Sequence, residues 1–156
     1  MKDFLCNSRA IMQYMVNKYA PDSYLYPKDP KQKAIVDRLL YFDMGTMFKS
    51  MREVYYPQVF KGEVPDQEKE QNFKTALGYL EGYLEKSTYV AGDKLTLADI
   101  SIIASLSMMD VLDYEYGSYP KISVWMAKVK EEIPDYKTTN DEPIQAFKAW
   151  VKSKQT

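Results

Sequence analysis

The sequence predicts an all-α protein in which helices pack around one buried central helix. Two observations support this fold class: apolar residues recur at helical spacing along most of the 156 residues, and proline or a capping residue stands where such stretches begin or end. An apolar fraction of 46% is enough for a continuous core without metal or disulfide support. We therefore expect one compact body.

Three helices are predicted in the first half of the chain, over about residues 7–18, 29–57 and 65–86. Asn7 or Ser8 can cap the first, and Pro21 prevents its continuation. Its apolar residues fall on two faces, so we expect it to be covered on both sides. The second helix has a proline in its first turn, where a missing amide proton costs nothing, and ends at Pro57.

The segment from Leu95 to Ile100 predicts the start of the central helix. Thr96 and Asp99 stand three residues apart as a capping box, in which each side chain reaches the other's backbone N–H. This structural role accounts for Asp99, so the sequence does not predict that it is a catalytic carboxylate. Residues 97–112 are apolar nearly all round, which marks a helix buried on every side.

Two further helices are predicted near the C-terminus, over about residues 118–132 and 141–152, and Pro134 separates them. Residues 2–6 are a candidate strand, but a lone strand has nothing to pair with. The prediction for the whole chain therefore stays all-α.

Composition excludes several classes of function. Lysine plus arginine number 21 against 22 acidic residues, so no basic excess favours nucleic acid. No apolar run approaches the ~18 residues that would span a membrane. Histidine is absent, which removes the commonest general base and zinc ligand, and the glycines lack the spacing of a phosphate loop. The N-terminus is too short and too polar for a signal peptide, so we expect a cytoplasmic protein. The single cysteine, which cannot form an internal disulfide, suits such a reducing compartment.

Several segments carry a family resemblance. Residues 95–100, after Tyr89-Val90-Ala91-Gly92-Asp93, resemble the signature of the helical C-terminal domain of cytosolic glutathione transferases. Four more segments resemble the insect delta and epsilon classes and follow the family's order: 8–14, 25–27, 41–46 and 55–60. The resemblance covers essentially the whole chain.

The resemblance implies a division of the chain and an activity. Residues 1–20 correspond to the last strand and helix of the family's thioredoxin-like N-terminal domain, and residues 21–156 to its C-terminal helical domain. Family members conjugate the glutathione thiolate to hydrophobic electrophiles in detoxification, with glutathione as co-substrate, no bound cofactor, and a homodimeric assembly. Their thiolate-stabilising hydroxyl comes from the first turns of the N-terminal domain, so we expect weak or no turnover from the 156-residue polypeptide.

Two alternatives accompany this hypothesis. A non-catalytic interaction module would share the fold, although the insect-type segments 41–46 and 55–60 argue against it. The shortening can also reflect an incomplete gene model.

The resemblance also assigns a glutathione site to Asn7, Ser8 and Arg9. The γ-glutamyl carboxylate of glutathione is placed at Ser8, at a helix N-terminus where free amides favour an anion. Asn7 stands where the family has a glutamate that holds the ligand's ammonium, a change that should weaken glutathione binding. From the residues alone, Asn7 and Ser8 are simple helix caps. Arg9 is either a contact across the dimer interface, as in the family, or a solvated charge.

The remaining assignments concern the long second helix. Tyr41 resembles the aromatic residue that insect classes lock against its twin across the dimer axis; otherwise it is an ordinary tyrosine. An apolar stripe resembles the wall of the electrophile site, and Phe147 and Trp150 of the last helix are placed beside it. Without the family, such a stripe is more often core. The wall residues are Met44, Phe48, Met51, Arg52, Tyr55, Tyr56 and Phe60.

Overall fold

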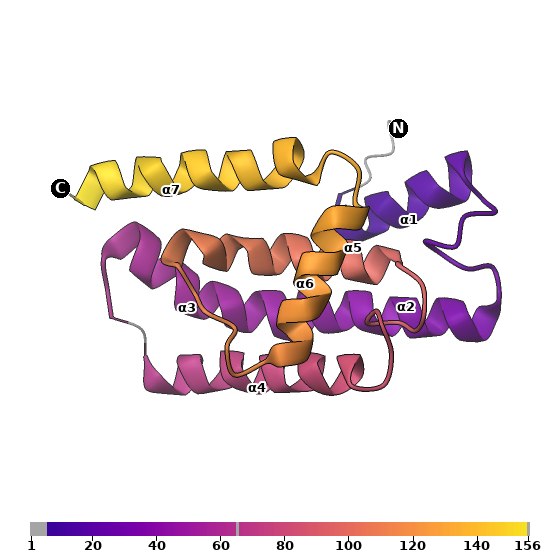
Figure 1. Ribbon diagram of the computed structural model, residues 1–156, viewed down its shortest axis with the longest axis horizontal. Coiled ribbons are helices and arrows are strands. Elements are labelled where there is room, and N and C mark those ends of the chain that lie inside the picture. Colours follow the sequence, from indigo (N-terminus) through magenta and orange to yellow (C-terminus); the bar gives the residue numbers. More distant parts are fainter. Residues whose placement is uncertain (1–5, 65, 156) are drawn as a thin grey trace.

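The computed structural model describes residues 6–64 and 66–155 and consists of helices joined by short loops (Figure 1). In chain order they are α1 (Ser8–Tyr19), α2 (Pro30–Phe42), the π-helix η1 (Asp43–Met47), α3 (Phe48–Lys61), α4 (Gln67–Leu84), α5 (Leu97–Leu106), the 3₁₀ helix η2 (Ser107–Leu112), α6 (Pro120–Glu132), the π-helix η3 (Lys137–Asp141) and α7 (Glu142–Gln155). Within the described residues, extended pairing is limited to one bridge between Tyr89 and Gly92. The predicted all-α class is confirmed. The candidate strand falls almost wholly on residues 1–5, outside the described part of the chain.

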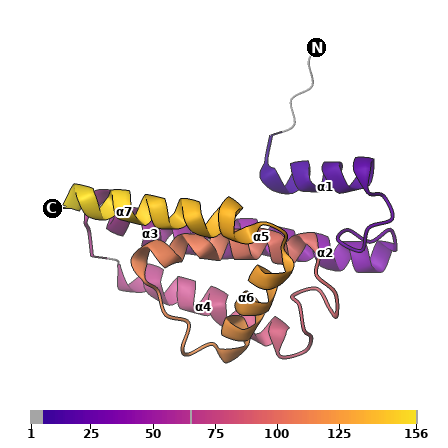
Figure 2. The same cartoon turned by 45° about the horizontal axis from the view of Figure 1, so that its top comes forward.

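The helices form a bundle around α5. Helices α2, η1 and α3 run on as one long rod, and α4 returns beside α3 (Figure 1). Helix α5 contacts α1, α2, α3 and α6, and eight of its ten residues are buried. Helix α7 lies along one edge, and α1 packs at the opposite end of the body (Figure 2). The sequence prediction of a buried central helix is therefore confirmed.

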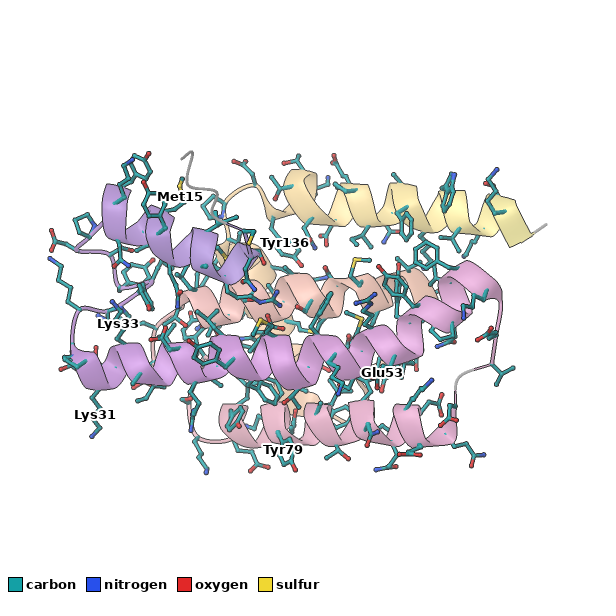
Figure 3. All side chains as sticks on the ribbon, turned by 180° about the vertical axis from the view of Figure 1, so that it is seen from behind. Met15, Lys31, Lys33, Glu53, Tyr79 and Tyr136 are labelled. Atoms are coloured by element: carbon teal, nitrogen blue, oxygen red, sulfur yellow. The ribbon has the colours of Figure 1, made fainter. Side chains whose placement is uncertain are left out.

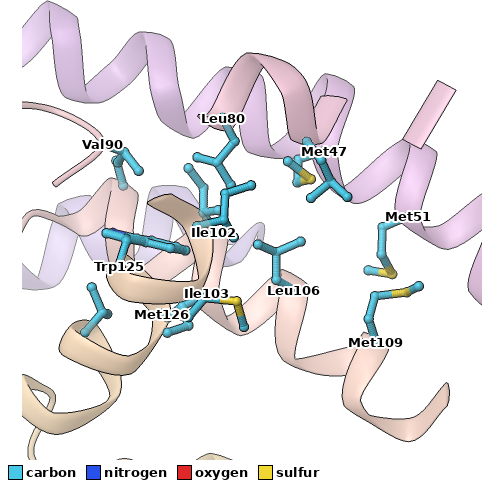
Figure 4. Packing of buried hydrophobic residues seen from close by; sticks show 14 of the residues in the cluster. Met47, Met51, Leu80, Val90, Ile102, Ile103, Leu106, Met109, Trp125 and Met126 are labelled. Atoms are coloured by element: carbon cyan, nitrogen blue, oxygen red, sulfur yellow. The ribbon is translucent and has the colours of Figure 1, made fainter. Parts of the chain in front are cut away.

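The core is filled by side chains from every layer of this bundle. Figure 4 shows Met47 and Met51 of the long rod, Leu80 of α4, Ile102 and Leu106 of α5, and Trp125 of α6 in one cluster. All six are at most 2% exposed. Burial of such large apolar side chains, each contributing about 1.5–3 kcal/mol, is what holds the layers together.

Two predicted helix ends are wrong. The long rod does not stop at Pro57, because Val59 beyond it packs into the core at 7% exposure and the helix continues to Lys61. Gly62 then ends it in the left-handed conformation with φ 65°, which glycine adopts at no steric cost. The central helix also tightens into a 3₁₀ helix from Ser107 instead of staying regular to residue 112.

Helix α1 is covered on one side rather than two. Met12 and Val16 pack against the core, whereas Ile11, Tyr14 and Met15 are 40%, 46% and 49% exposed. Figure 3 shows Met15 on the outer side of α1. Within the described structure, the prediction that both faces are covered is therefore wrong.

The carboxylate of Asp99 fixes the start of α5. One oxygen accepts from the Thr96 backbone N–H at 2.8 Å and from the Thr96 hydroxyl at 2.9 Å, and these residues form the capping box that the sequence predicts. The other oxygen accepts from the Val90 N–H and from the Trp125 indole N–H, both at 2.9 Å. Burial raises the pKa of Asp99, while these four donors act in the opposite direction. One side chain thus ties α5 to the preceding loop and to α6.

We expect Asp99→Asn to lower the free energy of unfolding by about 2–4 kcal/mol. The N–H₂ group of the amide would face N–H or O–H donors that have a carboxylate oxygen as their acceptor in the parent protein. Urea unfolding followed by far-ultraviolet circular dichroism, which does not depend on Trp125, measures this change. Asp93→Asn, at an exposed position in the same loop, is the matched control and should leave the midpoint unchanged. If Asp99→Asn does not accumulate, Trp125→Phe removes one of the four bonds and should cost about 1 kcal/mol. A parental midpoint for both variants would contradict the role given to Asp99.

Candidate functional site

The N-terminus of α1 holds the residues predicted to bind glutathione. Asn7 caps the helix by accepting the Arg9 backbone N–H at 3.0 Å, and it has a positive φ of 87°, which asparagine adopts more readily than most residues. Its side-chain amide donates to the Met44 sulfur at 3.4 Å. Ser8 is exposed, and its hydroxyl oxygen accepts from the Arg9 guanidinium at 3.4 Å. Free amides and the exposed Ser8 hydroxyl thus meet at one helix end.

Arg9 forms a buried ion pair that sequence analysis missed. Its Nε and Nη2 groups donate to Asp43 Oδ2 at 3.2 and 2.6 Å, and Asp43 is fully buried. The Ser101 hydroxyl donates to the same oxygen, and Ser105 lies 3.5 Å from Arg9 Nη2. Asp43 Oδ1 has no partner among the described residues. The charge of Arg9 is therefore used to join α1 to η1 and α5.

The sequence carried a signal for this pair that was not used. Asp43 is a charged residue inside a helix whose neighbouring stripe is apolar, and the two serines interrupt an otherwise apolar central helix. Buried charges need a partner, so a carboxylate in such a position predicts a cation elsewhere in the chain. Its identity was not predictable, because Arg9 lies 34 residues away.

In the π-helix η1, the adjacent residues Asp43 and Met44 point in different directions. The π-helix directs Asp43 into the core, at 0% exposure, and Met44 outward, at 42% exposure. A π-turn adds a residue to the helix and shifts the face that the following residues present. Phe48, the first residue of α3, lies under the Arg9 guanidinium with its ring centre 5.6 Å away.

A cavity of about 630 Å³ lies along the outer side of α3, next to this helix end. Five of the residues predicted for the electrophile wall line it: Met44, Phe48, Arg52, Tyr56 and Phe60. They follow one another at intervals of four, so each lies about one helical turn from the next. The remaining lining residues are Lys49, Glu53, Pro57, Lys61 and Lys69.

Met51 and Tyr55 do not belong to this wall, and their assignment to it is corrected. They are 2% and 1% exposed and point into the core, because each stands one position before a wall residue, Arg52 or Tyr56, and so lies about 100° further round α3. The Tyr55 hydroxyl has no partner among the described residues, and burial raises the pKa of Tyr55 to about 12. This hydroxyl therefore stays protonated near neutral pH.

An aromatic row continues from the cavity to the last helix. The rings of Tyr56 and Phe60 lie 5.0 Å apart, and Phe60 lies 6.2 Å from Phe147. Phe147 stacks on Trp150 at 5.7 Å. Phe147 and Trp150 thus extend the apolar surface beside the cavity but are not part of its lining.

Two further assignments concern the surface. Tyr41 is 68% exposed on α2. The interpretation of Arg9 as a solvated charge is wrong, since its side chain is 18% exposed and ion-paired within the chain; its interchain contact stays a prediction. Among residues 6–64 and 66–155, no three metal-ligating side chains converge and no helix has the length and apolar character to cross a membrane.

We expect Arg9→Met to destabilise the protein by about 3 kcal/mol, because it leaves the Asp43 charge buried without a cation. In the double variant Arg9→Met/Asp43→Asn the charge is gone as well, so its loss should be clearly smaller than the sum of the two single losses. Urea unfolding of the four proteins gives this coupling. Lys28→Met, which breaks the exposed pair with Asp22, should change little. Additive single effects would contradict a direct pair.

Comparison with known proteins identifies the family to which this sequence and fold are similar. The model described as "Glutathione S-transferase, C-terminal domain" matches residues 40–132. A delta-class glutathione transferase of Nilaparvata lugens is 44% identical, with a TM-score of 0.90, over 98% of this chain and 72% of that one. A Bombyx mori glutathione transferase is 37% identical with a TM-score of 0.85, over 94% and 70%.

An epsilon-class enzyme of the housefly, Musca domestica, is also similar. It is 34% identical with a TM-score of 0.83, over 96% of this chain and 70% of that one. The chain thus shares its sequence and its helical fold with insect enzymes of both classes. The chain belongs to the glutathione S-transferase family.

Proposed function

We propose that this chain carries part of a glutathione site at the N-terminus of α1 and an electrophile site on the outer side of α3. Its contribution to conjugation is to hold the tripeptide and the apolar substrate side by side. In the reaction that joins the two, the glutathione thiolate forms a bond to an electrophilic carbon. In a substitution the group displaced from that carbon leaves with the bonding electron pair, and in an addition the pair of the carbon's double bond moves to the neighbouring atom, which takes up a proton. The wall supplies binding and orientation, while flexible methionine and flat rings accept varied apolar shapes.

One contact supports this proposal more than any other. The Asn7 amide lies 3.4 Å from the Met44 sulfur, so the helix end that would hold glutathione touches the first residue of the apolar wall. A ligand that combines a glutathione part with an apolar group on its sulfur would therefore cover both surfaces without a gap. Proximity of this kind is what converts two binding sites into one reactive arrangement.

The domain division and the assembly belong to the same proposal. We assign residues 1–20 to the thioredoxin-like part of the family fold and residues 21–156 to the C-terminal helical domain. The exposed ring of Tyr41 supports a homodimer contact on the surface of α2. Arg9 is proposed first as a positioning residue, because its guanidinium fixes α1 through Asp43. A cytoplasmic location accords with a family of enzymes that use glutathione as co-substrate.

The wall is tested with S-hexylglutathione, whose hexyl group would extend from the α1 helix end along α3. We expect Met44→Ala to weaken its binding about fivefold, since roughly 1 kcal/mol of apolar contact is removed. Met15→Ala is the matched control: Met15 is similarly exposed, at 49% against 42%, but lies on the outer face of α1. Titration calorimetry measures both. No binding to the parent protein would refute the site and favour a non-catalytic module.

The glutathione half is tested by restoring a carboxylate at position 7. Asn7→Glu should bind glutathione about fivefold more tightly, because a charge-assisted bond to the ammonium, worth about 1.5–3 kcal/mol, exceeds the strain of a long side chain at φ 87°. Asn17→Glu makes the same charge change at an exposed position of α1 and should have no effect. Equal affinities for Asn7→Glu and Asn17→Glu would sink the assignment of Asn7 to this site.

A further inference from the structure

The cavity on α3 is lined by more positive than negative side chains, in addition to its apolar wall. Four cationic side chains, Lys49, Arg52, Lys61 and Lys69, line it together with one carboxylate, Glu53. The whole chain has a formal net charge of −1, so this excess of positive charge is local and opposite in sign to the protein. Figure 3 labels Glu53 on α3.

Most of these cations have no carboxylate partner in the described part of the chain. Among the residues that the structure describes, Lys49, Arg52 and Lys69 have no acidic group within 4 Å, and neither does Glu53 have a cation at that distance. Lys61 lies 3.7 Å from Glu63, but both side chains are more than half exposed, so this pair neutralises little. The positive charge is therefore available to a ligand.

The cations border an aromatic floor. The Arg52 guanidinium lies 4.7 Å above the Tyr56 ring, whose centre is 5.0 Å from that of Phe60. Flat rings attract another aromatic group through offset or edge contacts. A cleft in which one sign of charge predominates between low-dielectric walls concentrates the electric field on a ligand that enters it. A ring on this floor would thus present an acidic substituent to the surrounding cations.

We propose that the electrophile site prefers aromatic electrophiles that carry an acidic group, such as a carboxylate or sulfonate, over neutral ones of the same shape. This inference rests on the proposed function and refines its substrate class. The aromatic part binds the floor formed by Tyr56 and Phe60, and the anion is held by Lys49 and Arg52 at the border. In this proposal Arg52 contributes to substrate specificity through its charge and does not only line the apolar wall.

The test compares 4-chloro-3-nitrobenzoate with its neutral carboxamide, which has the same ring, the same reactive carbon and nearly the same shape. Titration calorimetry should give a dissociation constant about fivefold lower for the carboxylate in about 0.01 M salt. Most of this preference should disappear in about 1 M salt, where the Debye length falls from about 30 Å to about 3 Å. The measured quantity is the ratio of the two constants, so changes that affect both ligands cancel.

Two double variants with the same charge change separate a local effect from that of net charge. Lys49→Gln/Arg52→Gln should bring the ratio close to one, whereas Lys86→Gln/Lys121→Gln, outside the cavity, should leave it near the parental value. An equal fall in both would overturn the proposal, and so would a carboxamide that binds as well as the carboxylate, although the apolar wall would then stand. Failure of both ligands to bind would refute the electrophile site itself and this preference with it.

Discussion

The buried carboxylate of Asp43 joins the parts of the chain that form the candidate site. It accepts from Arg9 of α1 and from Ser101 of α5, and it sits at the start of the π-helix between α2 and α3. A charge with no exposed surface must be compensated by hydrogen bonds and an opposite charge, and few positions of Arg9 satisfy both demands. The helix end that carries Asn7 is consequently held against Met44, the first residue of the wall.

A second buried carboxylate, that of Asp99, joins separate segments of the core in a similar way. Its four donors among residues 6–64 and 66–155 are neutral groups from three different segments, and no cation of those residues pairs with it. The carboxylate of Asp99 fixes how helix α5 begins. The carboxylate of Asp43 fixes which elements pack against the middle of that helix. The capping of the central helix and the geometry of the site are thereby set by separate residues, so a substitution at the cavity border leaves that capping untouched.

The sequence predicted the helices well because their signals are local. Prolines, caps and the Thr96/Asp99 box lie within a turn of the feature that they determine. The ion pair of Arg9 was missed because its partner is distant in the chain, and the outward side of α3 was misjudged for Met51 and Tyr55. Periodicity shows that a helix has an apolar stripe, but not whether a given residue of the stripe meets the core or a cavity. That decision depends on neighbours brought together by the fold.

The π-helix η1 also sets what kind of sequence change the site can absorb. Because it holds one more residue than a regular helical turn would need, loss of a residue between positions 43 and 47 would make the helix regular. The widened turn takes up the extra residue, so losing both together would leave the side chains of α3 pointing in nearly the same directions relative to α2. Phe48 and Tyr56 would still face the cavity, and the core residues of α3 would stay buried. A deletion in the regular part of α2 or α3 would instead turn every following side chain by about 100°. This short stretch can therefore absorb a change in chain length that the helices on either side of it cannot.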